Sequence, residues 1–293
     1  MLKKTQQKYR RLKFRLQNNS PNVLYSKTVI VPKIYNASPI PITGNSDFEV
    51  HVLVSKRDFP AMLWGLYSFY YNSSKEIGLV VHDDGSLDEF HSRQLQTIFP
   101  GSSLIFRSFS DLKIDKYISC FPKCKEFRKA HPTHLKLIDF FFFSKTEKII
   151  FFDSDIIFFK EPKQIINEKH NIFIEDLWTN YILSPLEIKS QFQINVPPKI
   201  NTGFGKINKN CFDMNFLEFC LSNEKLGRGM FTSEQTLVAM LAAREGVKTA
   251  SGAYKMDLKK GIQEKVVKHY TSVIRYLLYI EGIPWVNRNL LKQ

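Results

Sequence analysis

The stretch Ile149-Ile150-Phe151-Phe152-Asp153-Ser154-Asp155-Ile156-Ile157-Phe158-Phe159 places two carboxylates, one residue apart, between two apolar runs. The first run belongs to the most hydrophobic predicted strand of the chain, residues 148–152. Two like charges at the end of such a strand are costly to bury unless a cation or strong donors compensate them. Ligands of open α/β sheets also bind outside the carboxyl ends of the strands. A hard divalent cation that joins Asp153 and Asp155 to a diphosphate meets both conditions, and the alternative is a turn with two solvated aspartates.

Short apolar runs alternate with helical periods on both sides of this stretch. Strands are predicted at residues 48–54, 77–82, 103–107, 148–152, 200–208 and 265–270. Helices are predicted at residues 59–71, 87–98, 132–143 and 233–244. This alternation is typical of an α/β fold with a Rossmann-like, mixed and mostly parallel sheet between two layers of helices. We expect one domain over residues 47–293, preceded by a basic N-terminal extension and an irregular, proline-rich linker in residues 1–46.

Composition limits the classes of protein to consider. The 293 residues are 43% hydrophobic and 14% aromatic, which excludes disorder as the main state of the chain. The formal net charge is +14, but no acidic residue precedes Asp47, and nine lysines and arginines lie before it. The body is therefore only mildly basic, and nucleic acid is not an expected partner.

The N-terminal segment and the cysteines bear on location. Residues 1–20 read as a basic helix that either contacts an anionic membrane surface or forms a solvated arm. The sequence has neither an apolar transmembrane window nor a secretory signal pattern, and its four cysteines suit free thiols. We expect a cytoplasmic protein that is associated with the inner face of the membrane if the basic helix binds lipid.

A second motif lies late in the sequence, where His269-Tyr270-Thr271-Ser272-Val273-Ile274-Arg275 follows a predicted strand. With the Asp-Ser-Asp stretch, it makes residues 48–280 similar to the GT-A fold nucleotide-sugar glycosyltransferases. In motif and order, the chain most resembles the glycogenin-type (family 8) branch and related bacterial families. This resemblance implies that Asp153, Asp155 and His269 hold Mn²⁺ or Mg²⁺ on the diphosphate of the donor.

The resemblance also assigns residues around the donor. Arg275 stands where the family has a diphosphate-binding lysine, and a guanidinium can hold two phosphate oxygens at once. Ser272 replaces the glycine of the family motif, so the backbone there departs from the family pattern. The other residues assigned to donor binding are Ser55, Arg57, Asp83 and Asp84 at two strand ends, Arg128 and Lys136 before the Asp-Ser-Asp stretch, Ser154 within it, and Asn201 and Gly203.

The implied reaction moves a hexosyl group from a nucleoside diphosphate sugar, with a UDP-sugar expected, to an unknown sugar, lipid or protein acceptor. Inversion needs a carboxylate base on the opposite face of the sugar, for which Glu234 and Asp176 are the candidates. Gln235 follows Glu234 in a pair that resembles the acidic-Gln pair of the family. The family has an acidic residue just before its NxG segment, whereas this chain has Pro197-Pro198-Lys199-Ile200. This departure leaves the stereochemistry open.

Three alternative functions compete with glycosyl transfer. A phosphoryl-transfer enzyme of the haloacid dehalogenase type would use Asp153 as a nucleophile and form an aspartyl phosphate. A zinc-stabilised module would use the group Cys120, Cys124, His131 and His134. A non-catalytic protein would bind a polyanion or a membrane through the basic N-terminal segment.

Overall fold

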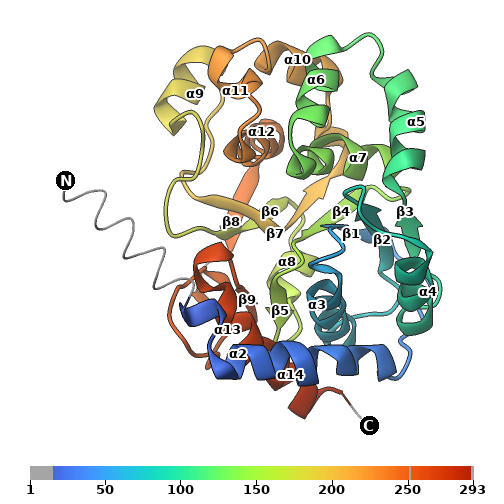
Figure 1. Cartoon of the computed structure of the whole chain (residues 1–293). Coiled ribbons are helices and arrows are strands. Elements are labelled where there is room, and N and C mark those ends of the chain that lie inside the picture. The colour runs from blue at the N-terminus through green and yellow to red at the C-terminus, as the bar shows by residue number, and fades with distance from the viewer. Residues whose placement is uncertain (1–15, 251, 292–293) are drawn as a thin grey trace.

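Figure 1 shows the computed structural model of the chain, which describes residues 16–250 and 252–291. Its centre is a seven-stranded sheet with the order β3-β2-β1-β4-β7-β6-β8. The pairs β2–β3, β1–β2, β1–β4 and β6–β8 are parallel, whereas β7 is antiparallel to both β4 and β6. The strands are β1 Phe48–Val54, β2 Gly78–Asp83, β3 Ser103–Ile105, β4 Lys148–Phe152, β6 Asn171–Glu175, β7 Ile200–Asn208 and β8 Val247–Ala250. The predicted mixed, mostly parallel α/β sheet is confirmed.

Both faces of the sheet are covered by helices, which explains why the strands read as continuous apolar runs. Ile150 and Phe152 of β4 pack into one core with α3 and α14, whereas Ile149 and Phe151 pack into a second core with α7 and α12 (Figure 1). The longer helices are α3 Phe59–Asn72, α4 Glu89–Ile98, α5 Arg107–Tyr117, α6 Pro122–Ala130, α7 Leu135–Phe143, α9 Pro185–Phe192, α10 Met214–Cys220, α12 Phe231–Arg244 and α14 Ile283–Asn289. The shorter α-helices are α2 Pro21–Tyr25, α8 Lys163–Asn167, α11 Glu224–Gly227 and α13 Arg275–Leu277. The 3₁₀ turns are η2 Val31–Asn36, η3 Pro132–His134, η4 Lys209–Cys211, η5 Gly252–Tyr254 and η6 Ser272–Ile274, and the π-helical turns are η1 Ser26–Ile30 and η7 Leu278–Gly282.

A second, two-stranded sheet brings the two sequence motifs together. The chain leaves β4 at Phe152, passes through the Asp-Ser-Asp turn and forms β5, Ile156–Phe158. This strand pairs antiparallel with β9, Val267–His269, so that Ile156 lies opposite His269. The short β5 is absent from the sequence prediction, and its pairing places the late histidine beside the two aspartates.

The segment before the sheet differs from the prediction. Residues 21–36, expected to be an irregular linker, form the consecutive helical turns α2, η1 and η2, because Val23, Val31 and Ile34 repeat at helical spacing and are buried against the body. Pro21 and Pro32 each stand at the start of a helical turn, where a missing N–H costs nothing. The predicted basic helix of residues 1–20 lies mostly outside the described residues. Within the described ranges, no helix is both long and apolar enough to cross a membrane.

Candidate active site at the carboxyl end of the sheet

Three side chains from the two sequence motifs converge at the end of β4. One ligand atom from each of Asp153, Asp155 and His269 lies within 4.8 Å of the other two. His269 Nε2 is 3.0 Å from Asp155 Oδ1 and 3.6 Å from Asp153 Oδ2. Two carboxylate oxygens and one imidazole nitrogen form a donor set that suits Mn²⁺ and tolerates Mg²⁺. No other such group of His, Cys, Asp and Glu occurs in residues 16–250 and 252–291.

Two residues of β7, Asn201 and Gly203, orient the imidazole of His269. His269 Nδ1 lies 3.1 Å from Asn201 Oδ1, an oxygen that only accepts, so Nδ1–H donates and Nε2 faces the carboxylates. Asn201 in turn donates from Nδ2 to Asp176 Oδ2 at 3.0 Å. At Gly203, a Cβ atom would lie 2.3 Å from His269 Cε1, so only glycine leaves room for the ring. Such outer partners are what hold a histidine ligand in position in metal sites.

Two cations compensate the buried carboxylates. Lys136 Nζ donates to Asp153 Oδ1, and Arg275 Nη1 lies 3.8 Å from Asp155 Oδ2. Burial by itself would raise the pKa of Asp155, but His269 and Arg275 outweigh it and lower that pKa. Burial opposes the charge on Lys136, yet Asp153 and Glu234 raise its pKa above the ordinary lysine value. Burial also opposes the charge on His269, and the carboxylates of Asp155 and Asp153 raise its pKa.

The cluster stands where two cavities meet. A cavity of about 810 Å³ opens on one side of Asp153, and one of about 440 Å³ opens on the other. Both are lined by Thr133, Lys136 and Asp153. The predicted donor residues Ser55, Arg57, Asp84, Ser154 and Arg275 line the larger cavity. The predicted residues Asp176, Asn201, Gly203, Glu234 and Gln235 line the smaller one, together with His269.

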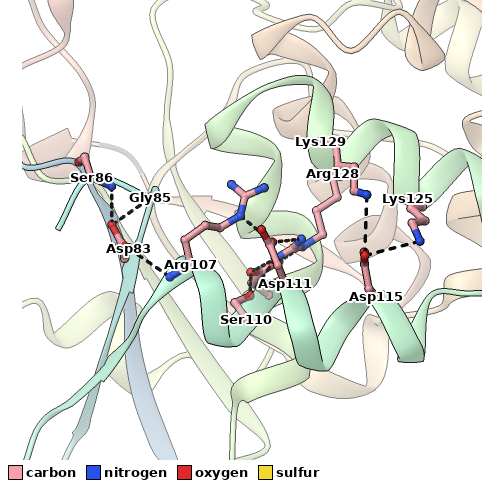
Figure 2. Close-up of polar contacts among 11 residues, drawn as sticks. Asp83, Gly85, Ser86, Arg107, Ser110, Asp111, Asp115, Lys125, Arg128 and Lys129 are labelled. Atoms are coloured by element: carbon pink, nitrogen blue, oxygen red, sulfur yellow. Dashed lines mark hydrogen bonds and ion pairs between the residues drawn. The ribbon is translucent and has the colours of Figure 1, made fainter. Parts of the chain in front are cut away.

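Asp83, a residue that we predicted to contact the donor, has a structural role instead. Its Oδ1 accepts from the backbone N–H groups of Gly85 and Ser86 at 2.8 and 2.9 Å, and its Oδ2 accepts from that of Arg107 at 3.1 Å (Figure 2). Asp83 does not line either cavity, whereas its neighbour Asp84 does. Asp83 therefore holds the turn that presents Asp84 and Ser86 to the larger cavity.

Arg128, also predicted to reach the donor, is 1% exposed and points into a polar cluster between α5, α6 and α7. Its guanidinium donates to Asp139 through Nε at 2.7 Å, to Asp111 through Nη1 at 2.6 Å and to Ser110 through Nη2 at 2.8 Å. Figure 2 shows this cluster, in which Arg107 also pairs with Asp111. With a second bond from Nη2 to Asp139 at 2.9 Å, these contacts use four of the five N–H groups of the guanidinium. Arg128 lines neither cavity and supports the packing of the three helices.

The candidate bases differ in how their oxygens are used. Asp176 Oδ1 accepts from the backbone N–H of Leu177 at 2.7 Å, and its Oδ2 accepts from Asn180 and Asn201. Glu234 is buried, burial raises its pKa to about 7, and its Oε1 has no hydrogen-bond partner among the described residues. Its Oε2 accepts a long hydrogen bond of 3.4 Å from Thr202. Of these two carboxylates, Glu234 thus has an oxygen without a hydrogen-bond partner among the described residues, whereas both oxygens of Asp176 accept hydrogen bonds, one of them from Asn201, the residue behind His269.

Gln235 connects the loop at Asn180 to strand β7 and lines the smaller cavity. Its Nε2 donates to the backbone oxygen of Asn180 at 3.2 Å, and its Oε1 accepts from the backbone N–H of Thr202 at 3.4 Å. These bonds occupy both ends of the amide. Gln235 is therefore suited to shape the sugar side of the site rather than to move protons.

The four residues of the alternative zinc module do not assemble. His134 directs its two ring nitrogens at the backbone oxygens of Phe127 and Met230, at 2.8 and 3.1 Å. Cys124 is buried, and burial raises the pKa of its thiol, whereas Cys120 is exposed. The zinc hypothesis is therefore wrong for these residues.

Several residues that line the two cavities were not predicted from the sequence. Asp58 directly precedes α3 and pairs with Arg275, its Oδ1 lying 3.2 Å from Arg275 Nη2. Its place after the first predicted strand was the signal that would have found it. Trp178, Asn180 and Thr232 line the smaller cavity from loops and a helix start that carry no motif.

The seven-stranded, mostly parallel sheet flanked by helices matches the GT-A fold of solved glycosyltransferase structures. The structure superposes on that of mouse xyloside xylosyltransferase 1 with a TM-score of 0.52 and 11% identity, covering 79% of this chain and 98% of that one. It also matches the structure of an active-site mutant of LgtC, with a TM-score of 0.50 and 13% identity over 76% of this chain and 87% of that one. No protein-family profile and no curated protein sequence matches the chain. The comparisons confirm the predicted GT-A fold, which is not that of a haloacid dehalogenase, and they do not single out the glycogenin-type branch.

Proposed function

We propose that the protein is a metal-dependent glycosyltransferase that moves a hexosyl group from a nucleoside diphosphate sugar, with UDP as the preferred nucleotide, to a hydroxyl of an acceptor. The observation that carries the proposal is the position of the Asp153, Asp155 and His269 ligand atoms at the junction of two cavities, with Lys136 and Arg275 alongside. A protein that only bound nucleotide would need the first cavity alone. A second cavity beyond the metal ligands gives the sugar and the acceptor a place.

The larger cavity suits the nucleoside diphosphate. It offers hydrogen-bonding groups of Ser55 and Asp84 at strand ends for the base and ribose, and Arg57 and Arg275 as cations. Mn²⁺ or Mg²⁺ held by Asp153, Asp155 and His269 would neutralise charge on the departing diphosphate. Lys136 and Arg275, already fixed against Asp153 and Asp155, add preorganised positive charge as the bond between the sugar C1 and the phosphate oxygen breaks.

The smaller cavity suits the sugar and the acceptor. Asn201, Gly203 and Gln235 line it next to the metal ligands, and Glu234 is the candidate to accept the proton of the acceptor hydroxyl as its oxygen bonds to C1. That arrangement corresponds to inversion. A retaining reaction would not need Glu234 as the base, so the anomeric configuration of the product, read by nuclear magnetic resonance, decides between the two.

The test is a thermal-shift screen of UDP-, GDP- and dTDP-sugars with and without Mn²⁺, followed by donor hydrolysis. We expect stabilisation by a UDP-sugar that depends on Mn²⁺, release of UDP, and loss of both in Asp153→Ala and Asp155→Ala. Unchanged hydrolysis and unchanged metal-dependent nucleotide binding in these two variants would refute the proposal. A trapped phosphoaspartate at Asp153 would favour phosphoryl transfer instead.

A further inference from the structure

Glu281 accepts hydrogen bonds from Lys268 and Tyr270, the two residues that flank His269 in the sequence. Lys268 Nζ is 2.7 Å from Glu281 Oε1, and the two side chains are only 2% and 7% exposed. The hydroxyl of Tyr270, which is also buried, donates to the same oxygen at 3.1 Å. Burial and the Glu281 carboxylate raise the pKa of Tyr270, so the phenol keeps the proton that it donates. One carboxylate thus holds the chain on both sides of a candidate metal ligand.

The strand that carries His269 needs such an anchor. β9 has three residues and forms a two-stranded sheet with β5, which has three residues as well. A two-stranded pair is at best marginally stable in water without further packing. Side chains alternate along a strand, so Lys268 points to the opposite side from His269. The bonds from Lys268 and Tyr270 to Glu281 therefore fix the backbone of β9 and leave the imidazole of His269 free to face the aspartates.

The same ion pair holds the loop that leads into β9. Lys268 Nζ donates to the backbone oxygens of Lys259 and Gly261 at 2.6 and 3.0 Å. Glu281 Oε2 accepts from the backbone N–H of Gly261 at 2.5 Å. The ammonium of Lys268 has three N–H groups, and its bonds to Lys259, Gly261 and Glu281 use all of them. Lys268 is therefore committed to the fold and has no donor left for a ligand.

We propose that Glu281 is a positioning residue for metal binding, which acts through Lys268 and Tyr270 to keep His269 Nε2 beside Asp153 and Asp155. This inference rests on the proposed function, in which those three side chains hold the metal. A buried ion pair adds little net stability compared with apolar side chains of similar size, so its use here is to fix one geometry. The adjacent Gly282 serves the same geometry, because a Cβ atom there would lie 2.9 Å from Tyr270 Cε2.

The test measures Mn²⁺ affinity by calorimetric titration and amide hydrogen exchange of residues 266–271 in the metal-free protein. Glu281→Leu should weaken Mn²⁺ binding about 10- to 100-fold, the usual loss when an outer partner of a metal ligand is removed. Amide exchange in residues 266–271 should become faster, because β9 has lost its anchor. Glu281→Gln keeps an oxygen that accepts from Lys268 and Tyr270, and it should show a smaller change in both measurements.

A double variant separates positioning from stability. Glu281→Leu by itself leaves Lys268 buried without its carboxylate and should lower the melting temperature. Lys268→Met with Glu281→Leu removes both charges and should recover most of that loss. Its Mn²⁺ affinity should nevertheless stay low, because no side chain then ties β9 to η7.

The matched control is Arg128→Met with Asp139→Leu, which removes a buried ion pair that lines neither cavity. The control should bind Mn²⁺ as the unmodified protein does. Unchanged Mn²⁺ affinity in the double variant of Lys268 and Glu281 would overturn this inference and leave the metal site standing. So would an equal loss of affinity in the control. Absence of Mn²⁺ binding to the unmodified protein would overturn the metal site and this inference with it.

Discussion

Two clusters of charged side chains in the molecule are built differently. In the cluster between α5, α6 and α7, Arg128 donates hydrogen bonds to Asp139, Asp111 and Ser110 (Figure 2). We call it the closed cluster because none of its members lines either cavity, and we call the group at the end of β4 the open cluster. At the end of β4, Asp153 and Asp155 also have a cation each, but they face two cavities and share His269. A self-contained cluster adds rigidity, whereas a cluster that opens on cavities can take a ligand.

The pKa values of buried acids also differ between the cluster around Arg128 and the smaller cavity. In the closed cluster, burial would raise the pKa of Asp111, but Arg128 and Arg107 outweigh it and lower that pKa. In the smaller cavity, burial raises the pKa of Glu234 to about 7, because Lys136 compensates it only in part. Incomplete compensation of a buried acid marks a place where protons and ligands can act.

Removing the carboxylates of the open cluster should have the largest effect. Asp153→Asn or Asp155→Asn should lower glycosyl transfer on the order of 10³-fold, since metal stabilisation of a leaving group is worth several kcal/mol. Steady-state kinetics with a UDP-sugar and saturating Mn²⁺ measures this. Asp115→Asn on α5, which loses only exposed pairs with Lys125 and Lys129, is the control and should remain active. Equal activities in all three proteins would remove the distinction between the two clusters.

Breaking the closed cluster should affect stability rather than chemistry. Arg128→Met leaves Asp139 buried without its partner and should lower the free energy of unfolding by about 3–5 kcal/mol. Urea denaturation followed by circular dichroism measures the loss. The folded fraction should keep its kcat, and the added change Asp139→Leu should restore part of the stability. A large fall in kcat at unchanged stability would indicate that Arg128 acts in the active site and would contradict this assignment.

Glu234 should make stability depend on pH. Its pKa rises from 4.5 to about 7 on folding, so the folded protein holds a proton that the unfolded chain releases between these values. Its contribution to stability is therefore greatest below pH 4.5 and falls as the pH rises to 7, by about 3 kcal/mol. Urea denaturation at several pH values gives the free energy of unfolding of the metal-free protein. The difference from the Glu234→Gln variant isolates the contribution of Glu234. A pH profile that the substitution leaves unchanged would show that Glu234 is already ionised at low pH.

The support behind His269 should matter for metal affinity. Asn201→Ala removes the oxygen that accepts from His269 Nδ1 and should weaken Mn²⁺ binding about 10- to 100-fold. Asn180→Ala is the matched control, because Asn180 also donates to Asp176 but does not contact His269. Calorimetric titration with Mn²⁺ should give the control an affinity close to that of the unmodified protein. An equal loss of Mn²⁺ affinity in both variants would mean that the hydrogen bonds of Asn201 and Asn180 act only through general packing and not through the orientation of His269.

The smallest expected effect concerns the acceptor side. Trp178 is 57% exposed and lines the smaller cavity, where its ring offers a flat apolar surface. Trp178→Ala should raise the KM for the acceptor about two- to tenfold and leave donor hydrolysis unchanged. Trp178→Phe, which keeps an aromatic ring, should have a smaller effect. An equal rise in the KM for the donor would move Trp178 to the donor side of the site.

The sequence predicted the strands that are long and apolar, and it singled out the three side chains, Asp153, Asp155 and His269, that converge at the end of β4. β1, β4 and β7 lie where their apolar runs place them, because both faces of these strands are buried. β9 lies within the strand predicted at residues 265–270. β5 has three residues and depends on pairing with β9, which local patterning cannot show, so it was not predicted. The helices of residues 21–36 were hidden by prolines that are tolerated at helix starts.

The motifs pointed to the residues that cluster at the end of β4, but they did not show which partner each charged side chain has. Arg128 and Lys136 are both cations shortly before the Asp-Ser-Asp stretch, and the sequence offers no means of separating them. Their partners decide their roles: Lys136 points at Asp153, whereas Arg128 points at Asp139 of α7. Asp83 and Asp84 are likewise adjacent, and only the structure shows that Asp84 lines the larger cavity and that Asp83 does not.

The central claim is that Asp153, Asp155 and His269 hold a catalytic metal on a nucleotide sugar. Its most direct test is electron paramagnetic resonance of Mn²⁺ titrated into the protein with UDP, for the unmodified chain and for His269→Ala and Asp155→Asn. We predict that the unmodified chain binds one Mn²⁺ ion and that its affinity rises with UDP. Both variants should lose this site while keeping the melting temperature of a folded protein. Unchanged Mn²⁺ binding in the two variants would contradict the claim.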